Sequence, residues 1–306
     1  MKTSPVTPAD LSRSVVAVPP FARHADLAPN WKANSALIAH LQEGGVRSLM
    51  YGGNANFYHV APSEYASILD FLAEAAGPDT WVLPAAGPDY GKLIDQALTL
   101  KSRSFPTAML LPMSFPFTDD GLASAIRRFT DILGKPAVVY IKADHYIRPD
   151  TLARLDEEKR VAAVKYAVVR ENSADDAYLR ELIKVLDRER LVSGIGERPA
   201  VVHLRDFGLT SFTSGSVCIA PKGSMQMLAL LREQRWQEAE RIREDYLPLE
   251  DCRDEISPIR VLHDAVTLAE IADMGPMLPM LSTLDERLRE RVAPVARRLL
   301  EIDRAR

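Results

Sequence analysis

Short runs rich in valine, isoleucine and leucine recur along this chain, and each is followed by a longer stretch whose apolar residues have helical spacing. This alternation is typical of repeated strand and helix units, so it constrains the chain to an α/β fold. Eight such runs predict strands at residues 14–18, 46–51, 81–84, 107–111, 137–141, 161–165, 191–193 and 210–214. Helices are predicted in the intervals, for example at 62–75, 90–102, 119–133, 173–187 and 223–232.

Eight strands with helices between them favour a closed (β/α)₈ TIM barrel, and an open doubly wound sheet is the rival fold. The barrel is preferred because the strand count is eight and because no strand is followed by the GxGxxG pattern of dinucleotide-binding sheets. The glycines at 52–53 and at 194 and 196 are too sparse for that pattern. We therefore predict a barrel domain over residues 1–232.

The strand signals stop after residue 232, and the remaining chain reads as three helices at 235–246, 257–271 and 284–302. Ser257 and Pro258 supply a cap and a first-turn proline for the middle helix. The helices are charged and amphipathic, so we expect them to pack on the barrel flank or on a neighbouring subunit rather than to take part in catalysis. We predict a C-terminal helical extension over residues 233–306.

The charge balance and the cysteines narrow the possible partners. The chain has 38 Lys and Arg residues and 42 Asp and Glu residues, which gives a net charge of -4. It therefore lacks the excess of basic residues that is typical of nucleic-acid-binding proteins. No run approaches the ~18 apolar residues of a membrane span, and no apolar signal segment follows Met1. Cys218 and Cys252 form no CxxC pair. We expect a cytoplasmic protein with a small-molecule partner, no nucleic acid and no membrane.

Lys165 interrupts the apolar run 161–168. A lysine there must reach solvent, find an anion, or occupy a pocket that favours its neutral amine. Active sites of barrels lie at the C-terminal ends of the strands, which is where Lys165 stands. Desolvation would lower its pKa and leave a free amine that attacks a carbonyl to form a Schiff base. An ion pair with a carboxylate is the structural alternative.

Tyr140 ends the strand before that of Lys165, so the two side chains are expected to be close. A phenol there could relay protons, although a strand-end tyrosine is often an ordinary residue at the rim of a core. Asn54 could hydrogen-bond a substrate, and the glycines at 52–53 could let backbone amides approach a carboxylate or could simply form a turn. No HxH or HExxH spacing predicts a metal, and Ser214 lacks the GxSxG context of a nucleophile.

Five segments, in order, resemble the dihydrodipicolinate synthase and N-acetylneuraminate lyase family of class I, Schiff-base-forming lyases on a (β/α)₈ barrel. The resemblance extends from about residue 15 to residue 221. The segments are 17–21 (AVPPF, for a first strand ending in TPF), 52–56 (GGNAN, for GTTGE), 139–141 (VYI, the tyrosine strand), 164–165 (VK, the Schiff-base strand) and 214–221 (SGSVCIAP, for SxxxNxxP).

The resemblance implies roles for six residues. Lys165 would form an imine with the 2-keto carbon of pyruvate or a related 2-keto acid, and Tyr140 would move protons. Gly53 and Asn54 would bind the carboxylate, Gly194 would lie on the substrate-selecting loop, and Ser214 would lie near the imine pocket. No metal or organic cofactor is expected. Family members commonly form tetramers, so a homodimer or homotetramer is expected.

The departures from the family pattern bear on the substrate. GGNAN lacks both threonine hydroxyls and the acid of GTTGE, and residues 112–115 (PMSF) lack the paired tyrosines of synthases. The YNxPxR arginine that grips the second substrate is also missing, which leaves Lys142 or His145 as a replacement without the fork of a guanidinium. Tyr166 stands where an acid often follows the lysine, and Cys218 replaces the asparagine. A lysine-pathway synthase is therefore disfavoured.

We predict a lyase that makes or breaks a carbon-carbon bond next to a pyruvate-type imine, as an aldolase or synthase. A dehydratase of keto-deoxy sugar acids, in which the imine assists loss of water, is the alternative within the family. A non-catalytic ligand-binding barrel is the alternative outside it. A metal-dependent class II aldolase is disfavoured because no ligand cluster is evident in the sequence.

Overall fold

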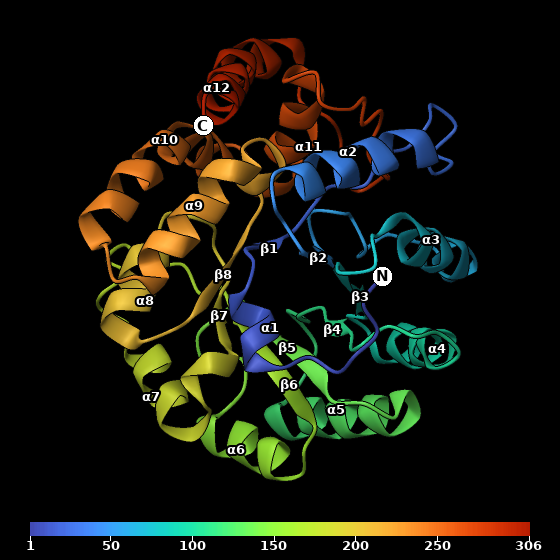
Figure 1. Ribbon diagram of the computed structural model, residues 1–306. Coiled ribbons are helices and arrows are strands. Elements are labelled where there is room, and N and C mark those ends of the chain that lie inside the picture. Colours follow the sequence, from blue (N-terminus) through green and yellow to red (C-terminus); the bar gives the residue numbers. More distant parts are fainter.

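The computed structural model describes residues 1–306. Eight parallel strands follow one another in chain order around a closed barrel, and the last pairs with the first (Figure 1). The strands are β1 (Val16–Ala17), β2 (Ser48–Tyr51), β3 (Trp81–Ala86), β4 (Met109–Leu110), β5 (Ala137–Ile141), β6 (Val161–Tyr166), β7 (Leu191–Ser193) and β8 (Ser211–Ser214). The predicted (β/α)₈ barrel is confirmed, and the open sheet is excluded.

Helices form a ring around the strands, as Figure 1 shows. They are α2 (Trp31–Glu43), α3 (Pro62–Ala75), α4 (Tyr90–Lys101), α5 (Asp119–Leu133), α6 (Pro149–Glu157), α7 (Ala177–Val185), α8 (Ala200–Phe207) and α9 (Pro221–Arg232). The prediction of a helix over 173–187 was wrong at its start. The Asp176 side chain accepts a hydrogen bond from the Leu179 amide, which places the helix cap at Asp176.

Helix α5 illustrates how the sequence specifies an outer helix. The Thr118 side chain caps it by accepting from the Gly121 amide, and Asp119 and Asp120 place negative charge in its first turn, where the helix dipole favours it. One face, which includes Ile126 and Phe129, is fully buried against the barrel. The cap and the apolar face together fix both the start and the orientation of the helix.

The predicted C-terminal extension contains three helices, α10 (Trp236–Glu255), α11 (Pro258–Leu268) and α12 (Glu286–Arg304). They gather on one side of the barrel beside α9 and α2 (Figure 1). The first was predicted to end at residue 246 but continues through Pro248 to Glu255. A proline leaves the carbonyl four residues earlier without a partner, but Glu244 and Pro248 are both exposed, so solvent can satisfy that group.

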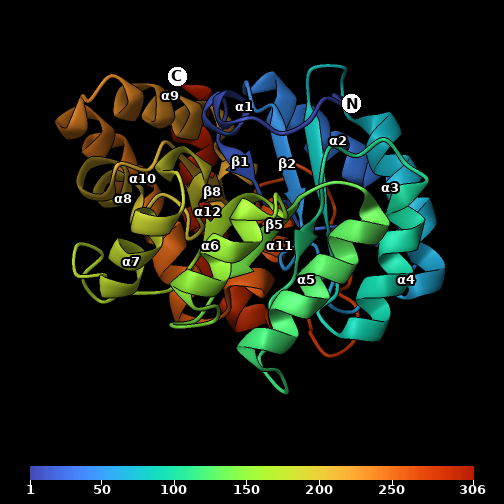
Figure 2. The same cartoon turned by 90° about the horizontal axis from the view of Figure 1, so that it is seen from below.

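The two ends of the barrel are covered differently. A short helix, α1 (Pro8–Ser12), lies at one end, and α11 lies toward the other end (Figure 2). Since α11 belongs to the C-terminal extension, that extension stands beside the strand ends where a barrel carries its chemistry.

None of the helices combines the length and the apolar composition that crossing a membrane requires.

Candidate active site

A cavity of about 210 Å³ lies at the C-terminal ends of the strands. Five of the six predicted site residues line it: Lys165, Tyr140, Gly53, Asn54 and Gly194. They come from β6, β5, the segment after β2, and the segment after β7. The barrel thus brings together residues that are more than a hundred positions apart in the chain.

Lys165 faces Tyr140 across neighbouring strands. The two residues are paired in the register of β5 and β6, and the Lys165 Nζ lies 4.4 Å from the centroid of the tyrosine ring. Lys165 is only 6% exposed and makes no ion pair with a carboxylate. Burial, assisted by the positive charges of Lys142 and Arg253, lowers the pKa of Lys165 to about 7. A substantial fraction of its amine is therefore neutral near neutral pH.

Tyr140 keeps its proton under the same conditions. Burial raises the pKa of Tyr140 to about 12, although the charge of Arg253 acts in the opposite direction. Its ring is in van der Waals range of the lysine amine, and the side chain also faces the cavity. A neutral phenol in this position can donate a proton to a reacting group and take it back.

The segment after β2 has the form of a carboxylate site. The backbone amides of Gly53 and Asn54 donate to no acceptor in the protein, whereas the amides of Asn56 and Phe57 bond back to Gly53 and Gly52. The Asn54 side chain donates to the Val18 carbonyl at 3.0 Å, which ties the segment to the end of β1. Two unpaired amides on a fixed turn can bind an anion.

Gly194 and Ser214 differ in their relation to the cavity. Gly194 lines it, and its amide donates to the Tyr166 carbonyl at 2.6 Å. Ser214 is fully buried, and its hydroxyl accepts from the Val217 amide at 2.9 Å. Thr213 and Gly215 line the cavity on either side of it, but Ser214 does not. A contact between Ser214 and a substrate stays a prediction.

The two candidates for the missing arginine are also placed differently. Lys142 lines the rim of the cavity and is exposed. His145 does not line it. The His145 ring packs against Tyr178 with 5.2 Å between ring centroids. Of these two residues, only Lys142 can face a ligand bound at Lys165.

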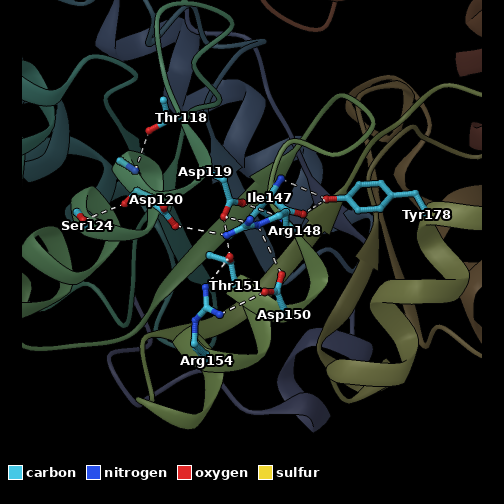
Figure 3. A network of polar contacts seen from close by, with 11 residues as sticks. Thr118, Asp119, Asp120, Ser124, Ile147, Arg148, Asp150, Thr151, Arg154 and Tyr178 are labelled. Atoms are coloured by element: carbon cyan, nitrogen blue, oxygen red, sulfur yellow. Dashed lines mark hydrogen bonds and ion pairs between the residues drawn. The ribbon is translucent and has the colours of Figure 1, made fainter.

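A network of polar contacts holds the segment that follows β5 (Figure 3). The Asp119 carboxylate accepts from the Arg148 amide at 2.7 Å and from the Thr151 hydroxyl at 2.6 Å, and the Tyr178 hydroxyl donates to the Ile147 carbonyl at 2.5 Å. Burial alone would raise the pKa of Asp119, but these hydrogen bonds and the charge of Arg148 lower it. The network fixes the end of the segment that carries Lys142.

The C-terminal extension contributes a wall of the cavity, which the sequence analysis missed. Glu250, Arg253 and Asp254 from α10 line the cavity, and so do residues 257–259 at the start of α11. The extension was expected to pack on the barrel flank or on a neighbouring subunit, and this expectation did not include a place in the cavity wall. The only local signal is the i, i+3 spacing of Glu250 and Arg253 on one helix, which is a common pattern on solvated helices.

Comparisons with known proteins give a sequence relative and solved structures of similar fold. No protein-family model matches this chain. It is 26% identical over 243 residues to the Bradyrhizobium diazoefficiens protein named "Probable 5-dehydro-4-deoxyglucarate dehydratase". The aligned region covers 77% of this chain and 75% of that protein.

Two solved structures show the same fold. Dihydrodipicolinate synthase from Bacillus clausii superposes with a TM-score of 0.83 at 20% identity, over 94% of this chain and 97% of that chain. A prophage protein of the dihydrodipicolinic acid synthase family from E. coli K12, in complex with pyruvate, gives a TM-score of 0.81 at 17% identity, over 94% and 98%. The resemblance predicted from the sequence motifs is confirmed.

Proposed function

Since its motifs, its fold and its sequence relative all connect this chain with the dihydrodipicolinate synthase family, we propose that it is a class I lyase that forms a Schiff base with a 2-keto acid. The observation that carries this proposal is Lys165, a buried amine without an ion-pair partner that lies against Tyr140 in the cavity. Its lowered pKa supplies the neutral nucleophile that imine formation needs.

The proposed reaction begins when the Lys165 amine attacks the keto carbon. The carbinolamine loses the former keto oxygen as water, and Tyr140 carries the protons that this step requires. The substrate carboxylate is held by the amides of Gly53 and Asn54. The resulting iminium withdraws electrons from the neighbouring carbon, which allows a carbon-carbon bond next to that carbon to break or form.

A second candidate is dehydration of a keto-deoxy sugar acid. It is favoured by the sequence relative, whose name is that of a dehydratase. In this reaction the iminium would promote loss of a proton from the carbon next to it, and the resulting enamine would expel hydroxide from the following carbon. Both candidates need the same imine, so they differ in the product and not in the nucleophile.

Reduction with sodium borohydride in the presence of pyruvate tests the shared step. We expect a reduced pyruvyl adduct on the peptide that contains Lys165, found by mass spectrometry after digestion, because borohydride traps an imine irreversibly. Analysis of products from a panel of longer 2-keto acids then separates aldol cleavage from loss of water. If neither pyruvate nor any 2-keto acid of the panel labels Lys165, the protein is a non-catalytic barrel or uses another mechanism.

The proposed enzyme is a homodimer or homotetramer. Phe115 is 84% exposed in the segment where synthases of the family carry their paired tyrosines, beside an apolar depression of about 490 Å³ lined by Leu93, Phe117 and Leu122 among others. We expect light scattering after size exclusion to show a dimer or tetramer that Phe115→Ser weakens. Met280→Ser is the control, because Met280 is equally exposed at 86% but lies in the C-terminal extension. A wild-type monomer at micromolar concentration would contradict the proposal.

A further inference from the structure

The ion pair of Glu250 and Arg253 on α10 lies against two segments of the barrel. A Cβ on Gly215, after β8, would lie 2.8 Å from the Arg253 Nη2, and a Cβ on Gly196, after β7, would lie 2.8 Å from the Glu250 Oε2. Both distances are shorter than ordinary contacts, so the barrel has glycine where the ion pair of the extension approaches. The ion pair thus fills a gap that these two glycines leave open.

The hydrogen bonds of Arg253 leave one of its nitrogens free. Its Nη1 donates to the Glu250 Oε1 at 2.8 Å, and its Nε donates to the Pro258 carbonyl at 3.3 Å. Its Nη2 donates to no group in the protein. The residue is 8% exposed, and it lines the same cavity as Lys165. A guanidinium fixed at two nitrogens, with its third nitrogen unpaired, is oriented for a ligand before the ligand arrives.

The other charges near Arg253 are already engaged. Glu250 also accepts from the Ser216 hydroxyl, and Asp254 is bridged to Arg198 at 3.1 Å. Burial, and then the charge of Glu250, raise the pKa of Glu197 above its ordinary value, which favours the neutral form of this carboxyl. Arg253 therefore forms an ion pair with one carboxylate, that of Glu250. A guanidinium has enough donors to bind a second carboxylate as well.

We propose that Arg253 binds a second carboxylate of the substrate, so that the site selects 2-keto acids that carry a carboxylate at both ends. This inference rests on the proposed function, because Lys165 fixes the keto carbon and the segment after β2 fixes the first carboxylate. Arg253 stands at a different part of the cavity wall, against the segment after β8, and its partner Glu250 lies against the segment after β7. A substrate held at both places spans the cavity with its keto carbon at Lys165.

Two six-carbon 2-keto acids test the proposal. They are 2-oxoadipate and 2-oxohexanoate, which have the same chain length and differ in whether the far end is a carboxylate or a methyl group. We expect isothermal titration calorimetry of the wild-type protein to show at least about tenfold tighter binding of the diacid, because a hydrogen bond between charged groups is formed only by that ligand. Equal affinities would overturn the proposal without any variant.

Variants identify the residue responsible for the preference. In the double variant Glu250→Gln with Arg253→Gln, two neutral amides replace the ion pair, so no buried charge is left unpaired. We expect the diacid preference, which is the ratio of the affinities for 2-oxoadipate and 2-oxohexanoate, to fall close to one in this variant. Glu250→Gln alone frees Arg253 from its partner and should keep or increase the preference. Lys142→Met, at the rim, should keep it. A preference that survives in the double variant, or that is lost only in Lys142→Met, would overturn the assignment.

The failure of this inference can be told apart from failure of the proposed function. Borohydride labelling of Lys165 is followed with both acids in the same samples. Labelling by both acids with equal affinities refutes only the role of Arg253. Absence of labelling refutes the imine, while the affinity ratio still reports on Arg253. If the double variant does not fold, as judged by circular dichroism, the wild-type pair and Glu250→Gln remain decisive.

Discussion

Lys165→Met is expected to abolish borohydride trapping and to lower turnover by more than roughly 10⁴-fold, since removal of a covalent nucleophile removes the reaction path itself. Methionine is close to lysine in length but has no amine, so the cavity should keep its shape. The control is Lys184→Met, on the exposed face of α7, which should leave trapping unchanged. Turnover is measured with the substrate that the keto acid panel identifies. Persistent activity in Lys165→Met would remove the amine from the mechanism.

The same amine should govern the pH dependence of trapping. Only the neutral form attacks a carbonyl, and the pKa of Lys165 is lowered to about 7, chiefly by burial. The rate of imine formation should therefore rise with pH up to about 7 and then level off, falling roughly tenfold for each pH unit below that value. A rate that keeps rising up to pH 10 would show that Lys165 titrates as an ordinary lysine.

Burial of Lys165 also has a cost in stability. The unfolded chain keeps this proton up to about the ordinary pKa of 10.5, whereas the folded protein releases it near 7. Between these values the unfolded state binds more protons, so the contribution of Lys165 to stability rises with pH, and the full penalty applies below about pH 7. Lys165→Met should raise the free energy of unfolding at pH 7 by about 2–5 kcal/mol, with a gain that shrinks toward pH 10 in urea titrations.

Gly194→Ala should have the opposite effect and be strongly destabilising. A Cβ at this position would lie 2.6 Å from the Tyr166 carbonyl oxygen and 2.8 Å from the Ala167 Cβ. The oxygen belongs to the backbone at the end of β6, so the clash cannot be relieved by rotating a side chain. We expect the free energy of unfolding to fall by at least about 2 kcal/mol, and imine formation to slow because Lys165 lies one residue before Tyr166.

Gly91→Ala is the matched control for this substitution. Gly91 lies in the first turn of α4, and the nearest atom to an added Cβ is the Asp89 Oδ1 at 3.9 Å. Alanine has the higher helix propensity, so this variant should be about as stable as the wild type or up to about 1 kcal/mol more stable. Comparable stabilities of the two variants would show that the segment after β7 can move away from β6.

The sequence was sufficient to predict the barrel and the pairing of Lys165 with Tyr140. Both follow from local patterns, because each apolar run marks a strand and consecutive strands of a barrel are neighbours. The apolar residues around Lys165 also indicated its burial. Strand ends were less well predicted. Only residues 16–17 of the predicted strand 14–18 pair with both neighbouring strands, because the ladder depends on partners elsewhere in the chain.

The role of Arg253 in the cavity wall could not be predicted in this way. It lies 88 positions after Lys165, on a helix with no strand-end signal, and it meets the barrel only because α10 continues through Pro248. Gly215, which contacts Arg253, and Gly196, which contacts Glu250, look like ordinary turn glycines in the sequence. Ser214 shows the reverse case, because its position at the end of β8 was correct but its hydroxyl is used by the Val217 amide.

Helix α10 forms part of the cavity wall, so the residues that react with the substrate and the residues that line the far wall lie on different elements. A barrel usually places both on the same strands and their following segments. The amine and the phenol lie within the hydrogen-bonded ladder, where most substitutions endanger folding, while Glu250 and Arg253 occupy one turn of a helix outside it. Over evolution, that turn could be exchanged to accept new substrates while the amine keeps its place on β6, and a change of charge at position 253 would also change the pKa of Lys165. In the laboratory, a small library at residues 250–254 is accordingly a compact route to altered substrate range.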